Sequence, residues 1–241
     1  MGLYWKFDPL GTAGGTLTPI AGSRGVFLSS GTTLVSSAMK ISGGTVGTGY
    51  PGDNMYIYSG GVATDTTVLN GGNMYIFSGG VASGITRDKV ASGDIYVSAH
   101  GRANDIVQSA RYLYCFGGTV SHVNMLGGAL VVRRRAGEPS GQAEDVVMAP
   151  WTTLAVYDSA TVVSCVLSGT SAKANVSSGG LISSAVVSTG LLTVYNGGTA
   201  HTATISSGGS LTVSSGGVAT DVTSMTGAVV TVIEGGTVTY T

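Results

Sequence analysis

Hydrophobic and polar residues alternate along most of the chain, in short runs that end at glycine pairs. The clearest run, residues 54–72, reads NMYIYSGGVATDTTVLNGG and is followed at once by a near copy that begins at Asn73. Alternation with a period of two predicts β-strands. The glycine pairs predict sharp corners, because glycine reaches positive φ without a Cβ clash. A strand–corner–strand unit repeated at fixed spacing predicts a solenoid.

With some drift, units of about 19 residues continue to the C-terminal part of the chain. Each unit should place a pair of apolar side chains inward from its first strand: Met55/Ile57, Met74/Ile76, Ile95/Val97, Leu154/Val156, Leu192/Val194, Leu211/Val213 and Val230/Val232. The second strand should offer a narrow inward slot (Ala63, Ala82, Val120, Ala200, Ala219) and a later one (Val68, Met125, Ile205, Met225). Few side chains are buried per coil, so a core forms only by stacking. We therefore predict an all-β fold, a single-stranded parallel β-helix (β-solenoid) of about eleven coils.

Residues 1–25 do not fit the repeat and carry Tyr4, Trp5 and Phe7. Terminal units of solenoids are commonly atypical because they cover the exposed apolar cross-section. We expect an N-terminal cap over residues 1–25 and solenoid repeats over residues 26–241, with a short irregular insertion at Thr45–Asp53.

Composition narrows the choice of protein class. Of 241 residues, 40 are glycine, and only 10% are charged while 43% are hydrophobic, which argues against a disordered chain. A net charge of −1 gives no electrostatic case for nucleic acid. No apolar run reaches the length of a membrane helix, and the first residues lack the features of a signal peptide. We expect no membrane insertion by this chain, and export would require a leader removed earlier or another route.

The Ser-Gly-Gly-x-Ala-x-x-Thr-x-Val-x-x-Gly-Gly pattern at Ser59–Gly72 nearly recurs at Ser215–Gly227. It resembles the AIDA-type strand-loop-strand repeats of bacterial autotransporter passengers, well over residues 54–93 and 171–236 and poorly in the middle. The resemblance implies a parallel β-helix at the cell surface or outside the cell, often adhesive and sometimes carrying heptose on Ser and Thr hydroxyls. The chain lacks that family's leader and its C-terminal membrane strands, so we interpret it as a passenger fragment or as a repeat protein with another use.

Catalytic chemistry has little support in the sequence. His122 falls in the outward slot of Asp65, and His201 lies many coils away, so the histidines should not converge. Polysaccharide lyases and hydrolases on β-helices need carboxylates gathered across neighbouring coils. The twelve acids look scattered, with Asp65 and Asp221 in one slot but about eight coils apart. We expect no catalytic residues, no metal site and no cofactor. Cys115 and Cys165 should not form a disulfide, because one full coil lies between the coils that contain them and the Cα atoms would be too far apart.

Two surface features are candidate binding sites. Outward slots of the early coils hold Tyr56, Tyr75 and Tyr96, with Tyr58 and Phe77 beside the corner. Stacked coils would bring these rings into a ladder, either as packing or as a platform for a sugar or a protein. Arg133, Arg134 and Arg135 precede Glu138, Glu144 and Asp145 in the longest unit, where we expect a bulging loop. Its charges either compensate one another or contact a partner or an anionic sugar.

The C-terminal stretch, with Val238 and Tyr240, keeps the strand pattern, and from Ala174 onward its only charged side chains are Asp221 and Glu234. An unprotected strand edge invites pairing, so we expect this end to stack head to tail on another copy and build filaments. Taken together, the sequence favours a non-enzymatic surface or extracellular fibre protein, adhesive or structural, with itself and host or cell-surface glycans as partners. A phage tail-fibre module that binds a host glycan and a polysaccharide-degrading enzyme are the alternatives.

Overall fold

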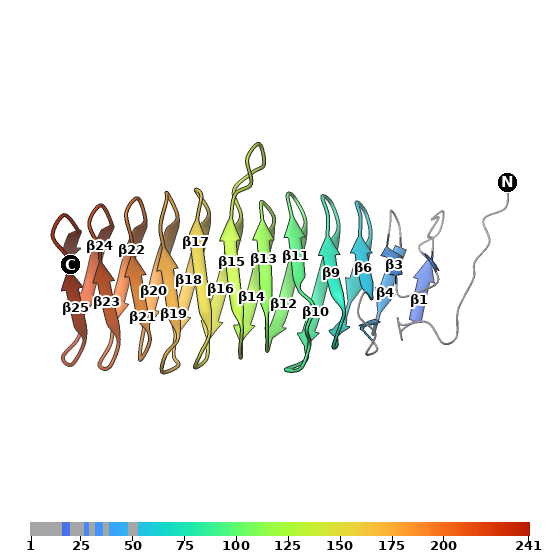
Figure 1. Ribbon diagram of the computed structural model, residues 1–241, viewed down its shortest axis with the longest axis horizontal. Helices are drawn as coiled ribbons and strands as arrows, with labels where there is room; N and C mark the ends of the chain where they lie inside the picture. Colours follow the sequence, from blue (N-terminus) through green and yellow to red (C-terminus); the bar gives the residue numbers. More distant parts are fainter. Residues whose placement is uncertain (1–15, 20–26, 29–31, 36–38, 48–52) are drawn as a thin grey trace.

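A computed structural model describes residues 16–19, 27–28, 32–35, 39–47 and 53–241 of the chain. All regular secondary structure in these ranges is β-strand, wound into a parallel β-solenoid of about 10 turns, which confirms the predicted fold class. Figure 1 shows the turns side by side along the long axis of a rod, each contributing one strand to each of two sheets. No helix of the described residues is long and apolar enough to cross a membrane.

The first sheet has 14 strands. They are β1 (Thr16–Pro19), β4 (Met39–Ser42), β5 (Thr45–Val46), β7 (Val62–Thr64), β8 (Thr67–Val68), β10 (Val81–Arg87), β12 (Arg102–Gln108), β14 (Thr119–Met125), β16 (Gln142–Met148), β18 (Thr161–Leu167), β20 (Leu181–Val187), β22 (Thr199–Ile205), β24 (Val218–Ser224) and β26 (Thr237–Tyr240). The second sheet has 12 strands. They are β2 (Phe27–Leu28), β3 (Thr32–Val35), β6 (Asn54–Ile57), β9 (Asn73–Ile76), β11 (Ile95–Ser98), β13 (Tyr112–Phe116), β15 (Ala129–Arg133), β17 (Thr153–Tyr157), β19 (Lys173–Val176), β21 (Leu191–Val194), β23 (Ser210–Val213) and β25 (Val229–Val232).

Equivalent strands of successive turns pair in parallel and in register from β3 and β4 onward, except that the register of β26 on β24 shifts between Ala219 and Val222. The start of the chain differs from the expected first coil, because β1 pairs antiparallel with β4, and β2 pairs antiparallel with β3. Most of the expected cap, residues 1–15 and 20–25, lies outside the described residues, so the cap stays a prediction. The insertion expected at Thr45–Asp53 also stays a prediction, because its central residues 48–52 lie outside the described residues.

The core runs along the axis between the two sheets, and the inward slots are occupied largely as the alternation predicts. Met55, Ile57, Met74 and Ile76 are fully buried, as are the alanines of the narrow slot. The assignment fails in the last turn. Met225 is 49% exposed because Ile205 pairs with Ser224, one residue earlier, and Val232 is 47% exposed on a strand with a neighbour on one side only.

Backbone geometry explains the glycine pairs and a recurrent bend. A Cβ on Gly80 would lie 2.6 Å from the carbonyl oxygen of Ile57 in the preceding turn, so the corner admits no side chain there. The seven-residue strands also bend at one left-handed position, filled in successive turns by residues such as Asp105, His122 and Asp145, with φ of 54°, 50° and 52°. Asp, Asn and His tolerate this conformation better than most residues.

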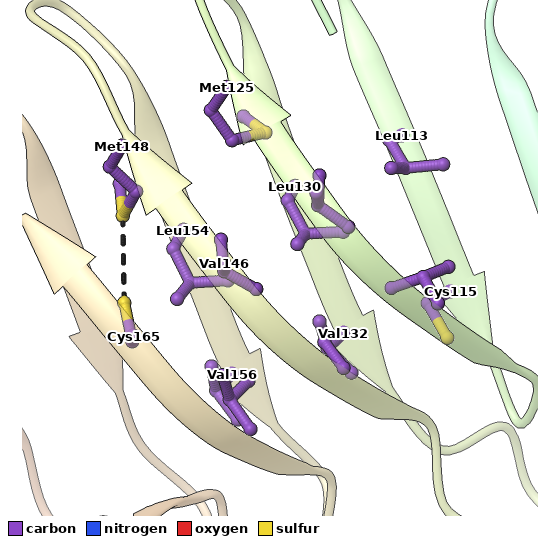
Figure 2. Close-up of a cluster of buried hydrophobic side chains, with 14 of the residues drawn as sticks. Leu113, Cys115, Met125, Leu130, Val132, Val146, Met148, Leu154, Val156 and Cys165 are labelled. Atoms are coloured by element: carbon purple, nitrogen blue, oxygen red, sulfur yellow. Dashed lines mark hydrogen bonds between the residues drawn. The ribbon is translucent and has the colours of Figure 1, made fainter. Parts of the chain in front are cut away.

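Cys115 and Cys165 are buried and unpaired, as predicted. Figure 2 shows Cys115 on β13 and Cys165 on β18, strands of different sheets, with several core side chains between them. Cys165 Sγ lies 3.9 Å from Met148 Sδ, and Cys115 Sγ donates to the carbonyl oxygen of Gly118 at 3.1 Å. Burial raises the pKa of each thiol to about 12, so neither has the thiolate character of a reactive cysteine.

Candidate functional site

A ladder of four stacked tyrosines follows the outward face of the early turns. The ring centroids of Tyr56, Tyr75, Tyr96 and Tyr114 are separated by 4.9, 4.9 and 5.0 Å in turn, with interplanar angles of 14°, 3° and 15°. The spacing follows the distance between paired strands, because each ring sits at the same register position as the last. The sequence predicted the first three rings. It missed Tyr114, which pairs with Tyr96 in a turn where the repeat is poorly kept.

A second row of rings lies beside the corner that follows each of these strands. Tyr58 and Phe77 stack at 4.9 Å and 12°. The same slot then holds Ser98, Phe116, Arg133 and Tyr157 in successive turns. Phe116 is turned by 37° from Tyr114 and by 52° from Tyr96, so it departs from the common plane of the other rings.

The arginine-rich segment meets this second row. The Cζ atom of Arg133 lies 4.6 Å from the centroid of Phe116 and 5.8 Å from that of Tyr157, and Arg135 lies 5.0 Å from Phe116. These are cation–π distances. The loop after β15, residues 134–141, projects beyond the other corners, as the sequence predicted (Figure 1). The ion pairs of the described residues involve none of Arg133, Arg134 and Arg135, so both interpretations of this loop stay predictions.

The loop and the corner together enclose a hollow of about 460 Å³, and its walls come from four successive turns. The residues that define it are Phe77, Ser98, His100, Phe116, Arg135 and Glu138. A second hollow of about 520 Å³ lies on the other side of the loop, lined by Arg133, Arg134, Arg135, Glu138 and Asp158. The two surface features that the sequence singled out separately are therefore one continuous surface.

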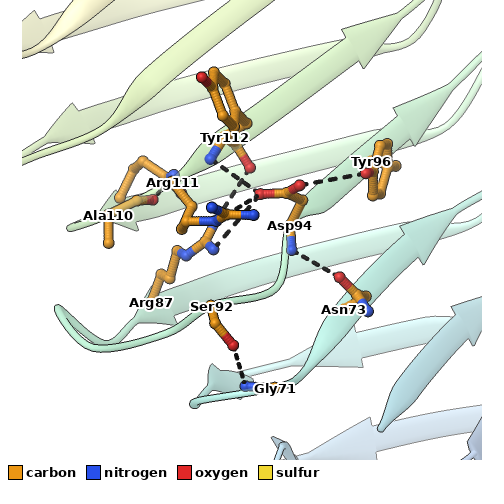
Figure 3. Close-up of polar contacts among 10 residues, drawn as sticks. Gly71, Asn73, Arg87, Ser92, Asp94, Tyr96, Ala110, Arg111 and Tyr112 are labelled. Atoms are coloured by element: carbon orange, nitrogen blue, oxygen red, sulfur yellow. Dashed lines mark hydrogen bonds and ion pairs between the residues drawn. The ribbon is translucent and has the colours of Figure 1, made fainter. Parts of the chain in front are cut away.

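A charge cluster that reaches from the core to the surface lies beside the ladder (Figure 3). Arg87 occupies the inward slot after Val68 and is 1% exposed; its Nη1 donates to the carbonyl oxygen of Tyr112 at 3.1 Å. Its Nη2 lies 3.9 Å from Asp94 Oδ1, and Arg111 Nε approaches the same oxygen at 3.7 Å. Burial lowers the pKa of Arg87 to about 10, against the opposing effect of Asp94.

Asp94 also connects this cluster to the tyrosines. The hydroxyl of Tyr96 donates to Asp94 Oδ2 at 3.3 Å, and the backbone N–H of Tyr112 donates to Oδ1 at 3.2 Å. Burial and then the charge of Asp94 raise the pKa of Tyr96 to about 12, so the phenol stays neutral. Sequence reasoning missed the cluster because it expected an apolar residue at the slot of Arg87. The available signal was an arginine at an inward position with an aspartate in the next unit.

The acids are less scattered than the sequence suggested. Asp105, His122 and Asp145 share the left-handed slot of adjacent turns, with His122 Nδ1 3.6 Å from Asp105 Oδ1 and His122 Nε2 3.6 Å from Asp145 Oδ2. All three side chains are exposed. His201 lies 3.3 Å from Asp221 in a distant turn, so the histidines do not converge. Within the described ranges, no group of His, Cys, Asp or Glu has an arrangement that could hold a metal ion.

Comparison with known proteins adds one informative neighbour. The fold is similar to the crystal structure of a hyper-glycosylated fragment of TibA, residues 55–350, whose glycosylation is catalysed by TibC. The two are 27% identical, with a TM-score of 0.63 over 86% of this chain and 80% of that one. No protein-family model matches the chain, and no curated protein matches it. The chain is thus similar to TibA in its β-solenoid, whereas its assignment to the AIDA-type repeats stays a prediction.

Proposed function

We propose that this chain is part of a non-enzymatic, adhesive passenger protein on the surface of a bacterium. The observation that carries the proposal is the likeness to the TibA fragment, which extends over most of both chains and keeps 27% identity. The passenger-like repeats at Ser59–Gly72 and Ser215–Gly227 point the same way. A rigid rod whose turns expose aromatic and arginine side chains suits a protein that presents a contact surface away from the cell.

The alternatives have weaker physical support. Polysaccharide cleavage by paired carboxylates requires two acids at a fixed separation beside a sugar-binding groove. The hollow that contains the aromatic rings has a single carboxylate, Glu138, among its lining residues. Asp105 and Asp145 flank His122 on an exposed face, and none of the three lines that hollow. A phage tail-fibre module remains an alternative on fold alone, since a solenoid serves many functions.

The adhesive role is tested with the purified, fluorescently labelled full chain on cultured epithelial cells, against a labelled globular protein of similar charge. We expect saturable binding to the cells that excess unlabelled chain displaces. Binding no greater than that of the control protein would contradict the adhesive role. Release of reducing or unsaturated ends from acidic polysaccharides would contradict the non-enzymatic assignment.

Glycosylation is a second part of the proposal, because the TibA fragment is hyper-glycosylated. This chain presents exposed serines immediately before its corner glycines: Ser59, Ser78, Ser178, Ser207 and Ser215. Co-expression with TibC should therefore add sugar to the chain, visible as regular increments in intact mass. Replacing these five serines together by alanine should remove those increments; an unmodified mass for the unaltered chain would contradict this part of the proposal.

A further inference from the structure

The hollow beside the arginine loop coincides with an interruption in the second row of rings. Phe77 and Phe116 occupy the same slot two turns apart, and the turn between them carries Ser98 instead of a ring. Two strand spacings amount to about 9.6 Å. The rings of the intact ladder are 4.9–5.0 Å apart, so the gap has the depth of one flat ring. Phe116 is 8% exposed and tilted, and Arg135 lies over its ring, so Phe77 is the wall that offers a face for stacking. Ser98 lines the hollow between the two phenylalanines.

Polar side chains line this gap together with the aromatic rings. Arg135 and Glu138 reach it from the loop, and His100 reaches it from the corner after β11. Arg135 and Glu138 are exposed, and His100 keeps a left-handed φ of 60°. Guanidinium binds carboxylate through two parallel hydrogen bonds, and a carboxylate accepts hydrogen bonds from hydroxyls. A few polar groups around aromatic walls are typical of sites that fix the orientation of a small ligand.

The balance of charge favours an acidic ligand. Around the two hollows on either side of the loop lie the guanidinium groups of Arg133, Arg134 and Arg135, against the carboxylates of Glu138 and Asp158. Arg133 is held between Phe116 and Tyr157, which leaves Arg135 as the cation that lines the gap. An anion that enters the gap would therefore meet Arg135, which forms no ion pair with any carboxylate of the described residues.

We propose that the gap at Ser98 binds one carboxylate-bearing pyranose ring of a glycan. An apolar face of the sugar stacks on Phe77, the tilted Phe116 closes the far side of the gap, Arg135 binds the carboxylate, and Glu138 accepts hydrogen bonds from ring hydroxyls. A pyranose fits better than an aromatic side chain of a protein partner, because a sugar carries polar groups around its whole rim and the lining is polar between the two rings. The inference rests on the proposed adhesive function and gives it a ligand class.

The chain itself supplies a matched control. Ser177 follows Val176 in the same slot, between Tyr157 and Tyr195 of the adjacent turns, so it interrupts the row in the same way. Neither hollow described above includes Ser177, and the loop with Arg135 is not part of its turn. Ser98→Tyr should fill the proposed site and extend the stack of rings, which favours folding. Ser177→Tyr should fill an equivalent gap without touching the site.

The test measures the Kd of the full chain by titration calorimetry for three probes: tri-galacturonate, 3′-sialyllactose and lactose. We expect at least one acidic probe to bind at least tenfold more tightly than lactose. The acidic probe with the lower Kd then shows whether the site prefers a uronate or a sialate. Ser98→Tyr and Arg135→Gln should each weaken that binding at least tenfold. Ser177→Tyr and Arg102→Gln, which alters an exposed arginine outside the hollow, should leave it unchanged. Unfolding midpoints verify that every variant is folded; should Ser98→Tyr not fold, Ser98→Val takes its place.

Three outcomes would overturn the site: neither acidic probe binds, lactose binds as tightly as the acids, or Ser98→Tyr binds like the unaltered chain. Binding of a tyrosine-bearing peptide at this gap in place of any sugar also overturns it. The cell-binding assay separates this failure from that of the proposed function. A chain that adheres to cells equally with and without Ser98→Tyr is adhesive through another surface, whereas a chain that binds the acidic probe but no cells has the site without the adhesive role.

Discussion

We predict that replacing Asp94 destabilises the protein much more than replacing its buried partner Arg87. Asp94→Asn removes the negative charge while keeping the shape of the side chain. It leaves Arg87, fully buried, with only the carbonyl oxygen of Tyr112 as a hydrogen-bond acceptor. Within the described part of the chain, the Nε and Nη2 groups of Arg87 have no hydrogen-bond partner. Leaving a buried charge without its partner costs about 3–5 kcal/mol, so we expect Asp94→Asn to lower the free energy of unfolding by that amount.

Arg87→Met should have a much smaller effect. Asp94 would keep the Tyr96 hydroxyl, the Tyr112 N–H and the nearby Arg111, so its charge stays compensated. Methionine suits the slot, because the same slot holds methionine at positions 125 and 148 in later turns. The unpaired carbonyl oxygen of Tyr112 costs about 1 kcal/mol, which the relief of a desolvated guanidinium offsets. We expect a net change within about 1 kcal/mol, and the double variant should recover most of the loss caused by Asp94→Asn.

The assay is urea unfolding followed by circular dichroism, together with amide hydrogen exchange. Exchange is needed because each turn of a solenoid contacts only its neighbours, so its stability is partly local. Protection in β11 and β13 should fall first in Asp94→Asn. Arg111→Met is the control, since Arg111 approaches the same carboxylate from an exposed position and such pairs contribute about 0–1 kcal/mol. If Arg87→Met destabilises the chain as much as Asp94→Asn, the pair is strongly stabilising and the reasoning is wrong.

Three further predictions concern the core, the thiols and the C-terminal turn. Ile76→Asp, at a fully buried position, should cost about 3–5 kcal/mol in urea unfolding, whereas outward Thr212→Asp should stay within about 0.5 kcal/mol; equal costs would refute the inward and outward assignment. The pKa of Cys165 is raised from 9.0 to about 12, so the unfolded chain loses this proton first and this thiol should lower stability as pH rises from 9 to 12, by roughly 4 kcal/mol at the upper limit. Cys165→Ala should remove this contribution and leave the similar one of Cys115. Head-to-tail stacking stays a prediction: light scattering should show mass rising with concentration, and lysine at Val238 and Tyr240 should abolish the rise, whereas a monomer at all concentrations would exclude stacking.

The sequence predicted those features that depend on a single strand repeated many times. Period-two alternation specified which of Met55, Tyr56 and Ile57 point inward, and pairing in register then made the tyrosine ladder a consequence of spacing. Features that depend on one unusual residue were harder to find. Arg87 interrupted the apolar pattern, and nothing in the repeat indicated its partner. Met225 was assigned one residue too late, because the register of the earlier turns places Ser224 in that slot. The position of a loop over a neighbouring corner, as with Arg135 and Phe116, is not encoded in the repeat at all.

Departures from the repeat are also where this fold can acquire a function. A perfect solenoid presents the same side chain at every turn, so it offers a ladder but no enclosed site. Three departures fall close together along the rod: Ser98 removes a ring, the loop at 134–141 adds charged side chains above the gap, and Arg87 with Asp94 fixes the tyrosines beside it. Ser98 and the loop lie in the middle turns, where the resemblance to autotransporter repeats is weakest, and Arg87 lies near the end of the well-matched stretch, residues 54–93. The well-kept repeats on both sides build the regular rod, and the irregular turns between them carry the surface where we propose that a ligand binds.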